Sequence, residues 1–310
     1  MTAIVVGVDG GGSLTRVMVA DARGTIIGES QAPGSAIRPG HADHSAEIIA
    51  GAVCDALAAS GIARGAPAVL CAGVAGAGRD SERQALLQAL SDRELASEII
   101  VHADASIALE DAFADGPGVL TIAGTGSVAF GRGPTGAFAR CGGWGAVCGD
   151  EGSGAWIGRR ALSVITAASD GREPETALVA AVLTAVDART ALDVIPWAAS
   201  ATPAALASLA PVVVAVAETG DLRANSILSL AAEELVLHIR TLARILFADE
   251  RAGCPVALAG GLLAPGAGLR KRVEHRLKTA VPGAQVRTEE VVAVRGAVRC
   301  ALREMGYRAL

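Results

Sequence analysis

Two glycine-rich turns, each lying between stretches of β-forming residues, constrain the fold of this chain more than any other feature. The first reads Asp-Gly-Gly-Gly-Ser at residues 9–13, and the second reads Gly-Thr-Gly-Ser at residues 124–127. Because glycine has no Cβ, backbone N–H groups at such turns can approach phosphate oxygens closely. We therefore expect two halves of similar build that face one phosphate chain. Hydroxyl groups could add further donors at Ser13, Thr15, Thr125 and Ser127.

The composition favours two domains whose cores are built from small aliphatic side chains. The chain has 310 residues, more than one hydrophobic core usually holds, and 51% of them are hydrophobic but only 3% aromatic. Its net charge of −5 gives no reason to expect nucleic-acid or acidic-membrane binding. The six cysteines form no C-x-x-C pair, and we find neither a signal peptide nor a breaker-free run of about 18 apolar residues. We expect a cytoplasmic protein that makes no use of a membrane.

Turn residues and hydrophobic periodicity divide the chain into two halves, with the boundary at Gly116-Pro117-Gly118. The first half is predicted to contain strands at 3–9, 14–21, 24–31, 67–73 and 98–103, and helices at 43–60, 80–91 and 105–114. The second is predicted to contain strands at 118–123, 127–132, 136–141, 255–259 and 284–287, and helices at 153–168, 173–186, 203–218, 222–248, 267–279 and 292–305. The order βββαβα appears early, and a version of it returns late.

Two carboxylates at predicted strand ends are candidates for catalysis. Asp9 ends the first strand, where it could hold Mg²⁺ or the water shell of that ion. Asp104 follows the strand at 98–103 where a helix begins. This position fits an N-cap and fits equally a general base at the carboxyl end of a sheet strand. One carboxylate can fill both roles.

The segment 141–156 has the composition of a binding loop rather than of a core element. It contains six glycines, two tryptophans and the pair Asp150-Glu151. The flat face of Trp144 could lie against a sugar or a base, and either carboxylate could accept hydrogen bonds from hydroxyl groups. The alternative is a structural loop with one tryptophan buried for packing. Asp150 could also cap the helix that begins near Ser153.

Several common motifs are missing or out of place. The chain has no Walker A sequence and no G-x-S-x-G elbow. Residues 131–136 match the dinucleotide fingerprint formally but lie between two predicted strands, so we interpret them as a turn. His41 and His44 lack a third convergent metal ligand, which favours ordinary polar residues at a helix start.

Taken in order, the motifs resemble those of the BadF/BadG/BcrA/BcrD-type ATPase family, in particular its N-acetylglucosamine kinase-like members, over nearly the whole chain. The resemblance rests on residues 9–13, 124–127, 141–145 with 149–153, 217–221 and 260–261. It implies an α/β fold of two actin-like ATPase (ribonuclease H-like) domains with a central cleft. The N-terminal domain would span 1–116, completed by the C-terminal helix at 292–310, and the C-terminal domain would span 117–291.

The resemblance also implies roles for individual residues. Asp104 would take the proton from a sugar hydroxyl. ATP would bind at Gly11, Gly12, Ser13, Thr125, Ala217, Gly260 and Gly261. The sugar would lie among Ala36, Asp104, Ser127, Gly143, Trp144, Gly145 and Asp150. Ala36 stands where relatives often carry an asparagine, a loss for which Ser35 or Arg38 could compensate, and Leu14 replaces a usual basic residue.

The implied activity is transfer of phosphate from ATP, with Mg²⁺, to the 6-hydroxyl of N-acetylglucosamine or glucosamine by a homodimer. N-acetylmuramic acid stays open as a substrate. So do two other functions: an ATPase activator of a dehydratase or reductase partner, and a non-catalytic sugar sensor. Cys141 and Cys148, the only close cysteine pair, do not match the iron–sulfur motif of the activators. The presence of both Asp9 and Asp104 argues against a sensor, because a sensor needs neither a metal ligand nor a base.

Overall fold

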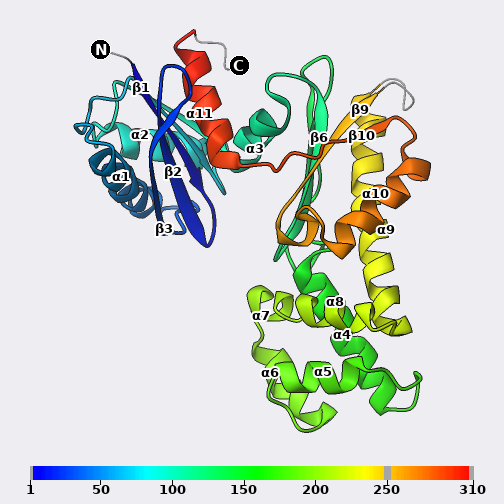
Figure 1. Ribbon diagram of the computed structural model, residues 1–310. Coiled ribbons are helices and arrows are strands. Elements are labelled where there is room, and N and C mark those ends of the chain that lie inside the picture. The colour runs from blue at the N-terminus through cyan, green and yellow to red at the C-terminus, as the bar shows by residue number, and fades with distance from the viewer. Residues whose placement is uncertain (1–2, 248–252, 307–310) are drawn as a thin grey trace. The chain divides into compact units, whose positions relative to one another are not determined.

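The computed structural model describes residues 3–247 and 253–306, and the chain divides into two compact units (Figure 1). The first unit comprises Met1–Gly116 and Val291–Leu310, and the second comprises Pro117–Glu290. Each unit contains one five-stranded mixed sheet. The first unit is discontinuous in sequence, because the C-terminal segment returns to the fold that the N-terminal segment begins.

Five strands form the sheet of the first unit: β1 (Ile4–Gly10), β2 (Leu14–Asp21), β3 (Ile26–Pro33), β4 (Val69–Val74) and β5 (Glu98–Ala103). Their order is β3-β2-β1-β4-β5. The strands β1, β2 and β3 pair antiparallel, whereas β1, β4 and β5 run parallel. The carboxyl ends of β1, β4 and β5 consequently lie along one edge of the sheet.

Helices cover both faces of this sheet. The helices α1 (Ala42–Ala59) and α2 (Asp80–Ser91) share an apolar cluster with Val6 and Leu70. The helices α3 (Asp104–Phe113) and α11 (Ala293–Glu304) share another with Val5 and Cys71. Neighbouring strand residues belong to different clusters because successive side chains point to opposite faces of a sheet.

Glycines let α11 lie close to the first sheet and to α3. A Cβ on Gly7 of β1 would come within 2.6 Å of the Val298 backbone nitrogen. A Cβ on Gly296 would clash with the Ile107 carbonyl oxygen in α3. A larger residue at Gly7 or Gly296 would therefore push α11 (red in Figure 1) away from the sheet or from α3.

The buried carboxylate of Asp111 joins α3 to α11. It accepts hydrogen bonds from the Val292 amide at 2.7 Å and from the Arg295 guanidinium at 2.6 and 2.8 Å. A nitrogen of Arg299 lies 3.3 Å from the same carboxylate. Only 1% of the Asp111 side chain is exposed, so these partners replace water as the source of hydrogen bonds.

The sheet of the second unit repeats the topology of the first. Its strands are β6 (Gly118–Ala123), β7 (Ser127–Arg132), β8 (Phe138–Gly142), β9 (Cys254–Ala259) and β10 (Ala284–Val286), in the order β10-β9-β6-β7-β8. The strands β6, β7 and β8 pair antiparallel, and β6, β9 and β10 run parallel. The two carboxyl ends of β6 and β9 therefore share an edge, where the second glycine turn lies.

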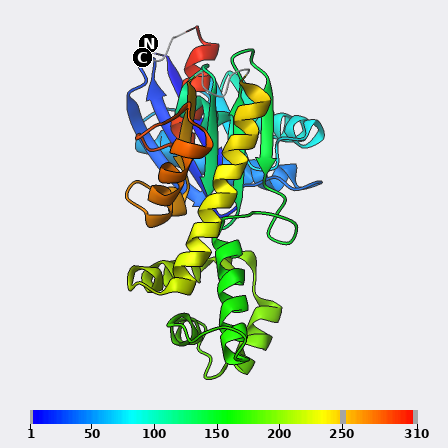
Figure 2. The same ribbon diagram turned by 90° about the vertical axis from the view of Figure 1, so that its right-hand side faces the viewer.

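Most of the helices that the structure describes belong to the second unit. They are α4 (Gly154–Ser169), α5 (Leu178–Ala185), α6 (Val194–Ser200), α7 (Pro203–Ala207), α8 (Ala210–Glu218), α9 (Leu222–Leu246) and α10 (Gly268–Ala280), with the 3₁₀ turns η1 (Ala191–Asp193) and η2 (Gly261–Leu263). The long helix α9 (yellow in Figure 2) contacts β6, β7 and β8. Within residues 3–247 and 253–306, no helix combines the length and apolar character needed to cross a bilayer.

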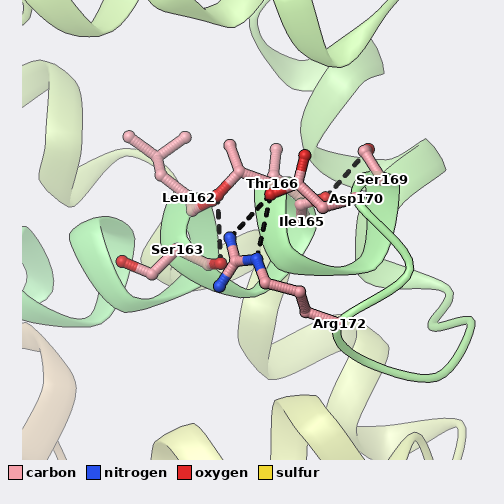
Figure 3. Close-up of polar contacts among 7 residues, drawn as sticks. All are labelled: Leu162, Ser163, Ile165, Thr166, Ser169, Asp170 and Arg172. Carbon is pink, nitrogen blue, oxygen red and sulfur yellow. Dashed lines mark hydrogen bonds and ion pairs between the residues drawn. The ribbon is translucent and has the colours of Figure 1, made fainter.

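The C-terminal turns of α4 satisfy their own polar groups (Figure 3). The Thr166 hydroxyl bonds to the carbonyls of Leu162 and Ser163 at 3.1 Å, and the Ser169 hydroxyl donates to the Ile165 carbonyl at 2.9 Å. Beyond the helix, Arg172 donates to the Asp170 carboxylate at 2.8 and 3.0 Å. We interpret these hydrogen bonds as those of an ordinary helix terminus and not as part of a binding site.

The sequence-based boundaries fail mainly between 173 and 218. The helix expected at 173–186 is limited to α5, and the segment after it contains η1 and α6, which we did not predict. The helix expected at 203–218 is split into α7 and α8, with Pro211 in the first turn of α8. Proline lacks the N–H that would continue α7, but it fits a first turn. Position 248, the end of the helix expected at 222–248, lies outside the described residues.

Candidate functional site

The two candidate carboxylates lie at the same edge of the first sheet. Asp9 is next to the last residue of β1, and Asp104 follows the last residue of β5. Because β1, β4 and β5 are parallel, all three strands end at this edge, which is where open α/β sheets usually bind ligands.

Asp9 is held in a half-buried position that disfavours its charge. Burial is the largest influence and raises the pKa of Asp9 to about 6. Arg16, whose guanidinium lies 3.8 Å from the carboxylate, lowers the pKa, and the charge of Asp104 raises it again. The two carboxylates therefore interact with each other, as two ligands of one cation would.

Asp104 is the first residue of α3 and not its N-cap. The N-cap is Ala103, which has no capping side chain, so our N-cap interpretation of Asp104 was wrong. The Asp104 Oδ1 accepts a hydrogen bond from the neighbouring Ala105 amide, at 2.9 Å. Burial raises the pKa of Asp104, and this bond opposes the rise. A carboxylate that prefers to take up a proton is what a general base requires.

The first glycine turn exposes its backbone. The Gly11 amide closes the turn on the Leu14 carbonyl at 3.0 Å, whereas the amides of Gly12 and Ser13 donate to no group in the part of the chain that the structure describes. Both residues are exposed. This geometry suits a phosphate, whose oxygens accept hydrogen bonds from successive amides.

The loop after β3 packs against this turn. The Ala36 amide donates to the Gly11 carbonyl at 3.1 Å. The Thr15 hydroxyl, which we expected near a ligand, is buried and bonds to the Pro33 carbonyl and to Ser35 Oγ, both at 2.8 Å. Ser35 is 1% exposed and is bonded to Thr15, whereas Arg38 is exposed.

The second glycine turn joins β6 to β7 in the second unit. The Gly124 amide donates to the Gly126 carbonyl at 2.9 Å, and the amides of Thr125 and Gly126 have no acceptor among the described residues. The exposed Gly260, which follows β9, has a positive φ of 89°, and a Cβ there would clash with the Ala123 carbonyl. Gly260, and Gly261 beside it, therefore lie at the same sheet edge as the second turn.

The N-terminus of α4 is bonded to the second turn. The Gly154 amide donates to the Gly124 carbonyl at 2.8 Å, and the Ala155 amide donates to the Thr125 carbonyl at 3.1 Å. Ser153 caps the helix, since its hydroxyl accepts from the Trp156 amide at 3.2 Å. Our expectation that Asp150 caps this helix was therefore wrong.

Asp150 instead links the glycine loop to the second turn. It adopts a positive φ of 58°, and its Oδ1 accepts from the Gly145 amide at 3.0 Å. A Cβ on Gly126 would lie 2.5 Å from its Oδ2, so the carboxylate borders the turn directly. Gly143 and Gly145 also have positive φ, which explains why this loop is rich in glycine.

The tryptophans of this loop differ in burial. Trp144 is 68% exposed, with the Arg140 guanidinium 4.8 Å from the centre of its ring, whereas Trp156 is 8% exposed within the core. Trp144 therefore presents the flat apolar surface that can stack on a sugar. Ser127 is buried, and its hydroxyl donates to the Glu151 carbonyl at 2.7 Å, which holds the loop.

Sequence reasoning missed His238, which supports the same loop from α9. Its Nε2 lies 3.7 Å from Glu151 Oε2, and its ring would contact a Cβ on Gly142. Burial lowers the pKa of His238, and Glu151 opposes this. A single histidine within a long amphipathic helix gives no signal of such a contact in the sequence.

Ala217 differs from the other predicted nucleotide residues. It is 7% exposed within α8, and its carbonyl accepts a hydrogen bond from the Asn225 side chain at 2.9 Å. The first unit thus brings together Asp9, Asp104, Ala36 and residues 11–13, and the second brings together residues 124–127, 143–145, Asp150 and Gly260. No hydrogen bond within the described ranges links Ala217 to the second set.

Comparison with known proteins assigns this architecture to a family. A sequence model of the BadF/BadG/BcrA/BcrD ATPase family matches residues 6–302. The chain belongs to that family. The α/β fold of two actin-like ATPase domains expected from the sequence is confirmed by the two five-stranded mixed sheets and by the similar solved structure described next.

Three similar proteins carry kinase names. The chain is 30% identical to an N-acetylmuramic acid/N-acetylglucosamine kinase of Clostridium acetobutylicum, covering 84% of this chain and 85% of that one. It is 29% identical to an N-acetyl-D-glucosamine kinase of Dictyostelium discoideum, covering 83% and 85%. A solved structure from Chromobacterium violaceum, provisionally named an N-acetylglucosamine kinase, superposes with a TM-score of 0.78 at 29% identity, covering 97% and 99%.

Proposed function

We propose that this protein is an ATP-dependent amino-sugar kinase that phosphorylates the 6-hydroxyl of N-acetylglucosamine or glucosamine. The observation that carries the proposal is the placement of Asp104. It is a half-buried carboxylate with a raised pKa, at the sheet edge that also holds Asp9 and the first glycine turn. The names of the two curated relatives support the same activity.

In this mechanism Asp104 is the general base. The sugar hydroxyl gives its proton to the Asp104 carboxylate, and its oxygen forms a bond to the γ-phosphorus of ATP. The bond from that phosphorus to the bridging oxygen breaks, and ADP leaves with the electron pair. Phosphoryl transfer depends mostly on positioning and charge stabilisation, so the base needs only the right place and an ionised state.

The backbone amides of the glycine turns bind phosphate oxygens. The amides of Gly12, Ser13, Thr125 and Gly126 are available for this, since they bond to nothing else in residues 3–247 and 253–306. In our proposal the adenosine binds at Gly260, Gly261 and Ala217. The sugar stacks on Trp144, and its hydroxyl groups donate hydrogen bonds to Asp150.

Asp9 would hold Mg²⁺. The fit rests on oxygen donors, which Mg²⁺ prefers, and on the mutual repulsion of Asp9 and Asp104, which a cation would relieve. Bound there, Mg²⁺ would neutralise negative charge on the phosphates. Asp9 would orient the ion, and Arg16, 3.8 Å from Asp9, would limit the net negative charge of the edge.

A coupled ADP-release assay with a panel of sugars tests the proposal. We expect ADP formation that depends on N-acetylglucosamine, glucosamine or N-acetylmuramic acid and is much slower with glucose or without sugar. Sugar-independent turnover, together with iron bound by an anaerobic preparation, would support the activator function instead. Sugar binding without turnover would support the sensor. The homodimer and the cytoplasmic location stay predictions.

A further inference from the structure

Two thiols and an imidazole converge inside the first unit, and none of the three residues has been assigned to catalysis. Cys71 lies on β4, His102 on β5 and Cys300 on α11, and one potential ligand atom from each lies within 4.8 Å of the other two. Cys71 is fully buried, Cys300 is 7% exposed, and His102 is half-buried. The kinase mechanism uses none of them.

The topology explains why these residues meet. In the parallel pair of β4 and β5, Cys71 is opposite Ile100 and Gly73 is opposite His102. Cys71 and His102 are therefore two positions apart along the register and project from the same face of the sheet. The helix α11 packs on that face and brings Cys300 from 229 positions further along the chain.

The surroundings favour loss of a proton from Cys300 and disfavour it from Cys71. A hydrogen bond between the two thiols lowers the pKa of Cys300 and raises that of Cys71. A nitrogen of Arg303 lies 3.8 Å from Cys300 Sγ and 2.9 Å from Glu110 Oε2. Arg303 thus favours a thiolate at Cys300, while its own charge is balanced by Glu110.

We propose that Cys71, His102 and Cys300 bind one Zn²⁺ ion. Two thiolates and a neutral imidazole are the soft donors that Zn²⁺ selects, with bonds of about 2.3 Å to sulfur and 2.0–2.1 Å to nitrogen. The side chains need only small movements to reach these distances from their present spacing. The three residues leave the fourth tetrahedral position of the ion to a water molecule.

Charge balance favours a divalent ion at this position. Two thiolates neutralise Zn²⁺, and the adjacent Arg303–Glu110 pair is neutral by itself, so no net charge is buried. The two protons of the thiols leave to solvent on binding. The site is chemically distinct from Asp9 and Asp104, whose oxygen donors suit Mg²⁺.

Cys254 shows what a cysteine without such partners looks like. It is buried on β9, and burial alone raises its pKa to about 11. A thiol of this kind packs as a small apolar group. The Cys71 cluster differs because a second thiol and an imidazole reach the same point.

Binding of Zn²⁺ would join α11 to β4 and β5. An ion that binds the folded state stabilises it by mass action, so occupancy should raise the Tm. Because His102 is two positions before Asp104, the ion would also anchor the end of β5.

Cobalt substitution tests the proposal on the full chain, without reference to kinase activity. The protein is freed of metal with a chelator, kept reduced with a thiol-free reductant and titrated with Co²⁺. We expect one Co²⁺ per chain, with thiolate-to-cobalt charge-transfer bands and the intense visible bands of tetrahedral coordination. Zn²⁺ should remove these bands and raise the Tm by several degrees.

The matched variants are Cys71→Ser, Cys300→Ser, His102→Gln and Cys148→Ser. The first two should lose the charge-transfer bands and the Tm shift. His102→Gln, which leaves the buried thiols in place, should weaken Zn²⁺ binding at least tenfold while the far-ultraviolet circular dichroism is unchanged. Cys148→Ser removes an exposed thiol and should behave like the unsubstituted chain.

Three results would overturn the proposal. The first is folded, reduced protein that gives no thiolate-to-cobalt bands. The second is binding that survives Cys71→Ser and Cys300→Ser but disappears in Cys148→Ser. The third is a mass two hydrogens lower without metal, because a disulfide between Cys71 and Cys300 would then occupy the place of the ion. None of these results would bear on the proposed kinase function.

Discussion

At the scale of single residues, the candidate site separates groups that can meet a ligand from groups committed to the fold. Asp104 accepts a hydrogen bond from the neighbouring Ala105 amide, and Trp144 is largely exposed. Thr15 and Ser127, which have the same hydroxyl chemistry as a phosphate-binding residue, are buried and bonded to backbone carbonyls. Ser127 therefore contributes by holding the loop at Glu151.

The rate of the reaction should depend on pH through the ionisation of Asp104. A base acts only when it is ionised, so kcat/KM should fall about tenfold for each pH unit below the Asp104 pKa. Since burial raises this pKa above the ordinary value of 3.8, the fall should begin at a higher pH than for an exposed aspartate. Rate measurements across the acid range check this. Saturating Mg²⁺ keeps Asp9, whose own pKa is raised to about 6, ionised in both proteins. Under this condition the residual activity of Asp104→Asn should lack that acid limb, and an identical limb in both proteins would contradict the assignment.

The second residue-scale prediction uses two glycines of the same turn. A Cβ at Gly126 would press on Asp150 Oδ2, whereas a Cβ at Gly124 would meet no heavy atom within 4 Å. We expect Gly126→Ala to raise the KM for the sugar by roughly tenfold, because Asp150 is displaced. Gly124→Ala should leave the sugar KM unchanged. Equal sugar KM values in both variants would show that Asp150 does not contact the sugar.

At the scale of elements, the strands around the glycine turns are predictable from the sequence, and the helices after α4 are not. The strand β2 follows the predicted 14–21 because period-two alternation is bounded by unambiguous turn residues. Residues 187–218 are rich in alanine and proline, so their periodicity does not show where one helix ends. The breaks at η1, α6, α7 and α8 depend on local capping and tertiary packing instead.

The candidate site is likewise predictable only where its residues follow a recognisable local pattern. Asp9, Asp104 and the glycine turns are identifiable because each follows a predictable strand. The link between Gly126 and Asp150, and the support of the loop by His238, depend on contacts between segments far apart in sequence. No local pattern encodes such contacts, and this explains why the role of Asp150 as a cap was predicted wrongly.

The stability of α9 should depend on the side chain of Asp221. It caps α9 by accepting from the Arg223 and Ala224 amides, and it also accepts from Thr176 and the Ala177 amide. Burial raises its pKa, but these hydrogen bonds outweigh that effect, and the net pKa is lowered. Asp221→Ala should therefore cost roughly 1–2 kcal/mol in urea unfolding at neutral pH.

The sign of the pH dependence follows from the lowered pKa. The stabilisation by Asp221 is present above its ordinary pKa of 3.8 and is lost as the pH falls through the folded value. The difference between Asp221→Ala and the unsubstituted protein should therefore shrink in acid. A difference that is constant with pH would contradict the charged cap.

At the scale of the whole molecule, the chain builds two sheets of the same topology, and the first unit needs both ends of the chain. The junction of α3 and α11 depends on Asp111, whose side chain is 1% exposed and meets Arg295 and Arg299. Removing this carboxylate leaves the Val292 amide and the two guanidinium groups without this acceptor, although the arginine side chains are partly exposed to water.

We therefore expect Asp111→Ala to destabilise the protein by about 1–3 kcal/mol. Thermal and urea unfolding measure this, and Asp43→Ala, at an exposed carboxylate of α1, serves as the control. Limited proteolysis of the Asp111 variant should cleave near α11 first. A loss below about 1 kcal/mol would mean that α11 is held by apolar packing alone.

The proposed kinase activity depends on Asp104 as the base that activates the sugar. The decisive measurement is sugar-dependent ADP release by Asp104→Asn, with ATP binding measured on the same preparation and Asp115→Asn, an exposed residue after α3, as the control. We predict that Asp104→Asn binds ATP normally and loses about 10²- to 10⁴-fold in turnover, while Asp115→Asn keeps its rate. Sugar phosphorylation by Asp104→Asn at the rate of the unsubstituted protein would contradict the account.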